Sequence, residues 1–294
     1  MTFISAVATP GYVLLASDRR ITTVIGESVD SQIDRDTKAI SLNGEYLMGF
    51  TGLARISGRK TEEWVVDTLA DVAPERYRRV LAEESSKVIT WPLTPHAYLG
   101  VGFRKVSGRF VPNAWLMTNA LDDEVFSPSL IDTEFASVVL KPSGCSADLW
   151  AVGGESDNAE IETRRISAIQ SARNDIRGMV THDPRTPRPV MNRLAELTAQ
   201  VSQLSDGSVG ATALVSILPL KGVGDLVPTT WLGDVPDSDL LLFPASITYV
   251  REFKGLRATR SYQPAIVHPG MMMFGLVSGP KEHGFFGPDP DMSA

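Results

Sequence analysis

The order of strand-like and helix-like segments limits the folds open to this chain more than any other feature. Apolar, β-branched and aromatic runs fill the first fifty positions, and two segments with apolar residues at helical spacing follow them. More strand-like runs, two longer helical segments and a further strand come next. The expected strands are Phe3–Thr9, Tyr12–Ser17, Ile21–Ile25, Lys38–Leu42, Tyr46–Thr51, Ala97–Phe103, Phe110–Thr118, Phe135–Leu140, Asp148–Val152 and Ala211–Leu218. This order predicts an α+β fold with two packed sheets between two helix pairs, a four-layer αββα sandwich.

Turn residues and helix breakers divide these segments. Pro10-Gly11 and Asn43-Gly44 each lie between two strand-like runs, which is typical of hairpins. The polar, aspartate-rich stretch 26–36 is expected to be a loop, and Pro74 is expected to separate the first two helices. The expected helices are Trp64–Val72, Tyr77–Ile89, Asn158–Arg177 and Val190–Leu204.

The last quarter of the chain has a different character. Leu240–Val250 reads as another strand, but beyond Gly255 the sequence is rich in Pro, Gly and Met. We therefore expect one αββα domain over residues 2–220 and a C-terminal extension over residues 221–294. The apolar run Met271–Phe274 suggests that this extension packs on the domain or on a neighbouring subunit.

Charge and composition argue against several classes of partner. The chain has 294 residues, with 28 basic and 35 acidic side chains and a formal net charge of −7. It lacks the positive field of a nucleic-acid-binding protein and the basic cluster of a membrane anchor. No apolar run approaches the ~18 residues of a spanning helix. We expect neither nucleic acid nor a membrane as partner.

Cysteine and histidine usage argues against metal and disulfide sites. The single cysteine, Cys145, excludes an intramolecular disulfide and a Cys-based metal site. The four histidines lack the spacing of metal ligands, so we expect them in loops or the core. They are His96, His182, His268 and His283. The expectation is a cytoplasmic protein with no signal peptide, no metal and no cofactor.

The first residues suggest a catalytic group. Removal of Met1 before a small residue would leave Thr2 with a free α-amino group. A threonine hydroxyl needs a base to act as a nucleophile, and an α-amino group titrates near neutral pH. A lysine close by lowers the pKa of that amine, an aspartate holds the lysine, and a backbone N–H stabilises an oxyanion. Asp18, Lys38 and Gly52 supply these groups in order along the chain.

Several short motifs strengthen this interpretation by their shared order. The motifs are Gly11-Tyr12-Val13-Leu14-Leu15-Ala16-Ser17-Asp18-Arg19-Arg20, Thr37-Lys38-Ala39-Ile40, Gly49-Phe50-Thr51-Gly52-Leu53-Ala54, Trp150-Ala151-Val152-Gly153-Gly154 and Ser205-Asp206-Gly207-Ser208-Val209-Gly210-Ala211. In these motifs the sequence resembles the proteasome β-subunit and HslV-type group of N-terminal-nucleophile hydrolases, and the step from Thr2 to Asp18 equals that family's step from nucleophile to aspartate.

The resemblance implies a threonine-type peptide or amide hydrolase. Thr2 would form an acyl-enzyme, Lys38 would tune its amine, and Asp18 would orient Lys38. The N–H of Gly52 would bind the oxyanion, with Gly49 in reserve, and Asp206 would support Thr2 from the far side. The implied partners are a peptide or protein substrate, further copies of the chain in a ring or related homo-oligomer, and an unfoldase.

Two positions depart from the family pattern. Gly154 stands where the family has a catalytic-site serine, so a hydroxyl is missing unless Ser156 replaces it. Val209 occupies the direct match of a second serine, and Ser208 fits only if the alignment shifts by one. Two alternatives therefore stay open: a non-catalytic structural or assembly subunit, and a small-molecule amidase on the same fold.

Overall fold

A computed structural model describes most of the chain up to residue 220 and three short strands beyond it. The described residues are 2–18, 20–25, 28–33, 38–42, 46–69, 72–90, 94–122, 125–141, 147–205, 208–211, 213–220, 229–232, 249–253 and 256–260. Several positions named in the sequence analysis lie outside them: the site residue Asp206, the turn Asn43-Gly44, Cys145, His268, His283, the apolar run Met271–Phe274 and most of the strand at Leu240–Val250.

One antiparallel sheet has the first strand of the chain near its edge. Its strand order is β14-β1-β2-β15-β16. The strands are β1 (Phe3–Ala8), β2 (Tyr12–Asp18), β14 (Asp148–Gly153), β15 (Ala213–Pro219) and β16 (Thr229–Leu232). The β1–β2 hairpin confirms the turn expected at Pro10-Gly11.

The second antiparallel sheet has seven strands in the order β13-β10-β9-β6-β5-β18-β17. They are β5 (Ala39–Leu42), β6 (Tyr46–Thr51), β9 (Ala97–Val106), β10 (Arg109–Thr118), β13 (Ala136–Leu140), β17 (Tyr249–Phe253) and β18 (Leu256–Arg260). The described strands of the extension thus continue the two sheets, β16 on β15 and β18 on β5. The domain boundary after residue 220 stays a prediction.

Three short hairpins lie outside the two main sheets. They pair β3 (Ile21–Ile25) with β4 (Ser28–Ile33), β7 (Arg55–Ile56) with β8 (Arg59–Lys60), and β11 (Leu121–Asp122) with β12 (Val125–Phe126). The expectation of a loop over 26–36 is wrong for β4, which pairs with β3 although its sequence is polar. Backbone pairing with a neighbouring strand overrides the weak local preference of such residues.

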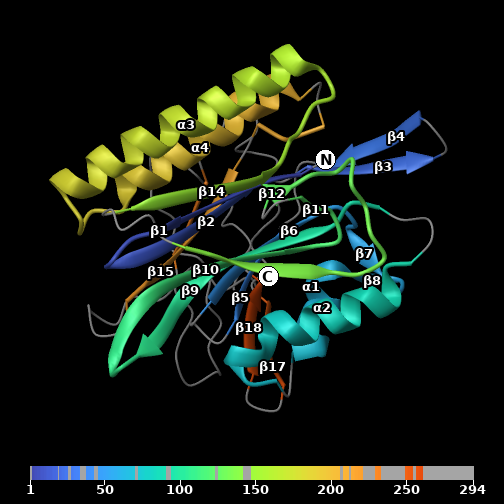
Figure 1. The fold of residues 1–294 in the computed structure, drawn as a ribbon, viewed down its shortest axis with the longest axis horizontal. Coiled ribbons are helices and arrows are strands. Elements are labelled where there is room, and N and C mark those ends of the chain that lie inside the picture. The colour runs from blue at the N-terminus through green and yellow to red at the C-terminus, as the bar shows by residue number, and fades with distance from the viewer. Residues whose placement is uncertain are drawn as a thin grey trace, which may run out of the picture.

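Helices cover the outer face of each sheet (Figure 1). α3 (Ala159–His182) and α4 (Arg188–Leu204) lie on the five-stranded sheet, and α1 (Thr61–Leu69) and α2 (Tyr77–Val88), preceded by the 3-10 turn Pro74–Arg76, lie on the seven-stranded sheet. The predicted αββα sandwich is confirmed. None of the helices described is long and apolar enough to cross a membrane.

Local sequence signals set the boundaries of the long helices. The side chain of Asn158 caps α3 by accepting hydrogen bonds from the N–H groups of Glu160 and Ile161, at 2.9 and 3.2 Å. Pro189 lies in the first turn of α4, where its missing N–H costs nothing. α3 continues five residues beyond the expected end at Arg177, as far as His182.

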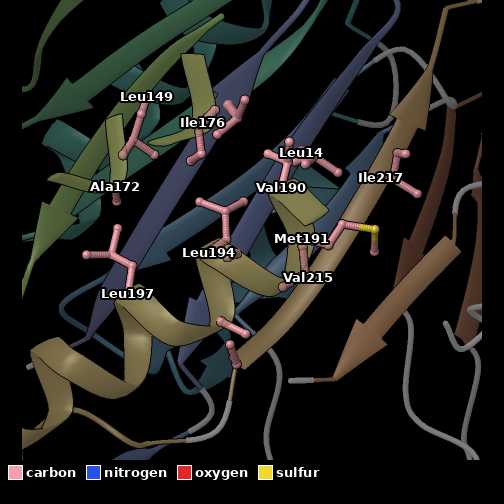
Figure 2. Packing of buried hydrophobic residues seen from close by; sticks show 14 of the residues in the cluster. Leu14, Leu149, Ala172, Ile176, Val190, Met191, Leu194, Leu197, Val215 and Ile217 are labelled. Atoms are coloured by element: carbon pink, nitrogen blue, oxygen red, sulfur yellow. The ribbon is translucent and has the colours of Figure 1, made fainter. Parts of the chain in front are cut away.

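The core has three layers because the inner strands are buried on both faces. In β1, Ile4, Ala6 and Ala8 face the other sheet, whereas Phe3 and Val7 face α3 and α4. Figure 2 shows side chains of α4, including Leu194 and Leu197, over the five-stranded sheet. A third cluster lies between the seven-stranded sheet and α1–α2. This double burial explains why β1 and β2 are mostly apolar.

We expect opposite effects from alanine at two glycines. Gly100 in β9 pairs with Trp115, and a Cβ there would lie 2.2 Å from the indole, whereas a Cβ at Gly178 in α3 meets nothing within 4 Å. Gly100→Ala should lower the free energy of unfolding by about 2 kcal/mol through overpacking. Gly178→Ala should raise it by about 0.5–1 kcal/mol by restricting the unfolded chain. Urea denaturation measures both, and equal effects would contradict this packing.

Candidate active site

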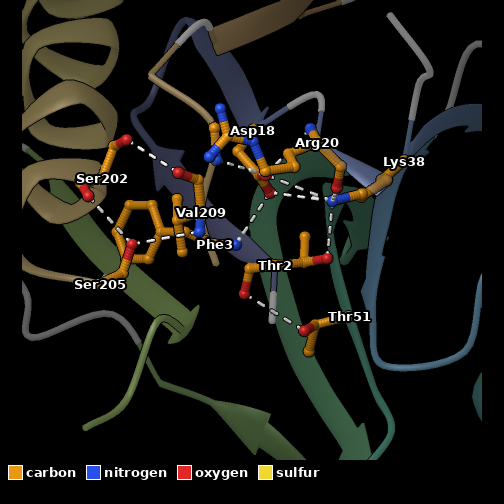
Figure 3. A network of polar contacts seen from close by, with 10 residues as sticks. Thr2, Phe3, Asp18, Arg20, Lys38, Thr51, Ser202, Ser205 and Val209 are labelled. Atoms are coloured by element: carbon orange, nitrogen blue, oxygen red, sulfur yellow. Dashed lines mark hydrogen bonds and ion pairs between the residues drawn. The ribbon is translucent and has the colours of Figure 1, made fainter. Parts of the chain in front are cut away.

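The structure brings together three residues predicted from the sequence. Thr2 precedes β1, Asp18 ends β2, and Lys38 precedes β5 of the other sheet. Lys38 Nζ donates hydrogen bonds to Thr2 Oγ1 at 2.7 Å and to the Asp18 carboxylate at 3.2 and 3.3 Å (Figure 3). All three residues are buried. The candidate site therefore lies where strand ends of the two sheets meet.

The register of β1 and β2 explains the place of Asp18. Ile4 pairs with Ser17, so the next step along the hairpin puts Phe3 opposite Asp18. The N–H of Phe3 donates to Asp18 Oδ1 at 2.9 Å. The N–H groups of Arg20 and Gly210 donate to Oδ2 at 3.1 and 3.0 Å. A buried carboxylate with three backbone donors and an ammonium partner has its charge well compensated.

Lys38 has an acceptor on each side. Besides Thr2 and Asp18, the carbonyl oxygen of Arg20 accepts a hydrogen bond from its ammonium. Strand pairing fixes the backbone, because the N–H of Phe50 donates to the carbonyl oxygen of Lys38 at 3.1 Å. The ammonium is thereby oriented with a proton toward Thr2 Oγ1. A cation in this place favours negative charge on that oxygen.

The carbonyl group of Thr2 is fixed from two sides. Thr51 Oγ1 donates to it at 3.2 Å. Gly153 lies against it on the neighbouring strand, and a Cβ on that residue would come within 1.7 Å of the Thr2 oxygen. Gly153 also has a φ of +91°, which other residues rarely adopt. Neither Thr51 nor Gly153 was assigned a role from the sequence, although both lie within its matching motifs.

Gly49 within β6 and Gly52 directly after β6 occupy different environments. Gly52 follows Thr51 directly and is exposed at the edge of the site, with a φ of +101°. Gly49 lies inside the sandwich, where a Cβ would come within 2.8 Å of the Ile4 side chain. Gly49 thus allows the two sheets to approach closely. Gly52 directly follows Thr51, whose hydroxyl contacts Thr2, and its role as oxyanion donor stays a prediction.

Serine side chains shape the loop between α4 and β15, a feature missed at the sequence level. Ser202 Oγ donates to the carbonyl oxygen of Val209 at 2.8 Å, and Ser205 Oγ accepts from the N–H of Val209 at 3.1 Å. These bonds place the next N–H, that of Gly210, on Asp18. Ser208 Oγ donates to the carbonyl oxygen of Ser205 at 2.8 Å. The hydroxyl of Ser208 is therefore used within the loop.

The departure from the family pattern at Gly154 has a structural counterpart. A Cβ at Gly154 would come within 2.7 Å of the Val201 side chain, so a side chain there would run into α4. Ser156 Oγ accepts from the N–H of Asn158 at 3.2 Å, at the start of α3. Within the described residues, neither position brings a hydroxyl to Thr2. Ser156 does not replace the family serine here.

Comparison with known proteins gives similarity at the level of structure. No protein-family model matches the chain, and no curated protein matches it. The chain is similar to Anbu (ancestral beta-subunit) from Yersinia bercovieri and to a structure described as the helical assembly of the Anbu complex from Pseudomonas aeruginosa. Each has 14% sequence identity and a TM-score of 0.41, over 80% of this chain and 88% of the other. At this identity the similarity concerns the fold alone.

One of the four histidines supports the turn that contains Gly52. His96 is fully buried, as expected for a core histidine, and its Nδ1 accepts a hydrogen bond from the N–H of Leu53 at 3.0 Å. Burial lowers the pKa of His96 to about 3. The ring is therefore neutral near pH 7. Among the described residues, no group of three His, Cys, Asp or Glu side chains lies close enough to hold a metal ion.

The buried His96 predicts a loss of stability in acid. Its pKa is about 3 when folded and about 6.5 when unfolded, so the unfolded state binds the extra proton between these values. The contribution of the neutral His96 ring to the free energy of unfolding is complete above about pH 6.5. It falls by up to about 1.4 kcal/mol per pH unit toward pH 3. Urea denaturation of wild type and His96→Phe from pH 7 to 4 measures it, and the variant should show a shallower dependence.

The matched control is Phe135→Leu, which changes the packing against the ring of His96 and removes no titratable group. It should lower the free energy of unfolding and keep the wild-type pH dependence. Parallel curves for wild type and His96→Phe would show that His96 does not titrate as its burial requires.

Proposed function

We propose that this chain is a threonine-type amide hydrolase in which Thr2, exposed by removal of Met1, is the nucleophile. The main support is the 2.7 Å hydrogen bond from Lys38 Nζ to Thr2 Oγ1 in a buried site that also holds Asp18. The lysine cation stabilises the oxygen as it loses its proton, and it also lowers the proton affinity of a nearby α-amino group. Asp18 keeps the cation in place.

The proposed reaction has two stages. The α-amino group of Thr2 takes the hydroxyl proton, and Oγ1 bonds to the carbonyl carbon of the substrate amide. The oxyanion formed accepts a hydrogen bond from the N–H of Gly52. The C–N bond then breaks as the α-ammonium group gives its proton to the leaving amine, which leaves an ester on Thr2. The same amine takes a proton from water, whose oxygen attacks the ester carbonyl. The ester C–O bond then breaks as the α-ammonium group returns the proton to Oγ1, which releases the acid and free Thr2.

The remaining assignments follow the resemblance to proteasome-type subunits. Asp206, proposed to support Thr2, lies outside the described residues. Peptides or proteins are the proposed substrates, and the chain is proposed to assemble with copies of itself. Light scattering tests the assembly, because a monodisperse monomer would contradict it.

The nucleophile assignment predicts that Thr2→Ala abolishes hydrolysis while Thr2→Ser keeps part of it. Removal of the nucleophile should lower kcat/KM by about 10³-fold or more. Cleavage of a proteome-derived peptide library, followed by mass spectrometry, avoids dependence on one chosen substrate. Intact mass should show a wild-type chain that begins at Thr2.

Ser5 provides a control on the same strand. Its hydroxyl is buried in β1 and has no hydrogen-bond partner within the described part of the chain, so Ser5→Ala removes a comparable group without touching the site. Its activity should equal that of wild type. Equal cleavage by Thr2→Ala and wild type would rule out Thr2 as nucleophile. Met1 retained on active protein would rule out the α-amino base.

A further inference from the structure

Three arginines of α3 cover the outer edge of β14. Strand β14 is at the edge of its sheet, and its partner on the inner side is β1. The guanidinium groups donate to carbonyl oxygens of β14: Arg165 to Gly153 at 3.2 Å, Arg173 to Leu149 at 3.0 Å, and Arg177 to Ala147, just before the strand, at 3.3 Å. Four residues of helix rise about 6 Å and two residues of strand about 6.6 Å, so the spacings agree.

At Gly153 a carboxylate binds the N–H of the same residue whose carbonyl oxygen accepts from the arginine. Arg177 is also paired with a carboxylate, that of Asp148, at 2.9 Å. Glu155 Oε1 accepts a hydrogen bond from the N–H of Gly153 at 2.9 Å. Arg165 is paired with both oxygens of Glu162, at 2.9 and 2.6 Å, and lies 3.9 Å from Glu155 Oε1. Both backbone polar groups of Gly153 are therefore bound on the side away from β1.

Gly153 is also the residue that faces Thr2. It pairs with Phe3, and its α-carbon lies so close to the carbonyl oxygen of Thr2 that no side chain fits between them. A shift of Gly153 therefore shifts Thr2 relative to Lys38. The Arg173 contact is remote by comparison, since Leu149 pairs with Val7, five residues after Thr2.

We propose that Arg165 and Glu155 are positioning residues for Thr2, acting through Gly153. This inference rests on the proposed function for its effect on catalysis, but the placement of Thr2 is measurable without activity. Arg165 holds the carbonyl group of Gly153 and Glu155 holds its N–H, so together they fix the end of β14 against the nucleophile. Orientation of a nucleophile contributes strongly to rate, because a 1 Å displacement costs about 100-fold.

The matched variants are Arg165→Gln and Arg173→Gln. Each removes a hydrogen bond from a guanidinium group of α3 to a carbonyl oxygen of β14, at Gly153 and at Leu149 respectively. Arg165→Gln should lower kcat by roughly 10- to 100-fold with little change in KM. Arg173→Gln should keep kcat within about twofold of the wild-type value. This difference is expected even if the two variants have the same unfolding midpoint. An equal loss of kcat in the two variants would overturn the proposal.

A second pair of variants separates the hydrogen bond from the bulk structure. The N–H of Gly153 needs an acceptor oxygen, which an amide supplies as well as a carboxylate does. Glu155→Gln keeps an acceptor and should restore most of the kcat lost in Glu155→Ala. Identical kcat in these two variants would overturn the role of Glu155. If Arg165→Gln does not fold, this pair of variants remains as the test of the proposal.

Hydrogen exchange gives the readout that does not need activity. Arg165→Gln should speed exchange at the start of β1, where the N–H of Phe3 is bound to Asp18, whereas Arg173→Gln should act near Val7. Unchanged protection at Phe3 in Arg165→Gln would overturn the positioning proposal. Absence of hydrolysis by processed wild type, with the exchange pattern as expected, would instead refute the proposed function and leave the positioning of Thr2 in place.

Discussion

The ion pair between Asp18 and Lys38 joins the two sheets at one end of the sandwich. It is buried from both sides, and it holds the end of β2 against the start of β5. A buried charge left without a partner is costly, so the surrounding backbone supplies N–H donors to Asp18 and a carbonyl acceptor to Lys38. The hydroxyl of Thr2 is a further acceptor of the ammonium.

The surroundings of Thr2 draw on segments far apart in the chain. The N–H of Gly210 binds Asp18 across 192 residues, and the hydroxyl of Thr51 binds the carbonyl group of Thr2. On the outer side, α3 reaches the end of β14 through Arg165 and Glu155. Every layer except the helix pair α1–α2 thus contributes a described contact to the site or to the residue beside it. A site of this kind depends on the assembled sandwich.

Much of the fold was predictable because its core strands are apolar on both faces and its helices carry clear start and stop signals. The expected helix beginning at Asn158 and the expected hairpin at Pro10-Gly11 are both present. The strand β4 was missed because its polar residues give no apolar pattern, and its pairing with β3 comes from backbone hydrogen bonds. The end of α3 was placed too early: Gly178 is a poor helix former, but the helix continues to His182 and Val180 packs in the core beneath it.

The sequence by itself determined the layer order and the chemical groups at the candidate site: a threonine behind Met1, an aspartate, a lysine and a glycine at fixed spacing. Tertiary structure alone decided that Lys38 Nζ lies 2.7 Å from Thr2 Oγ1, that Gly153 meets the carbonyl oxygen of Thr2, and that Arg165 holds Gly153. The physical reason is that local patterns report which face of a strand or helix is buried. Distances between segments follow only from strand register and from the close packing of one layer on the next.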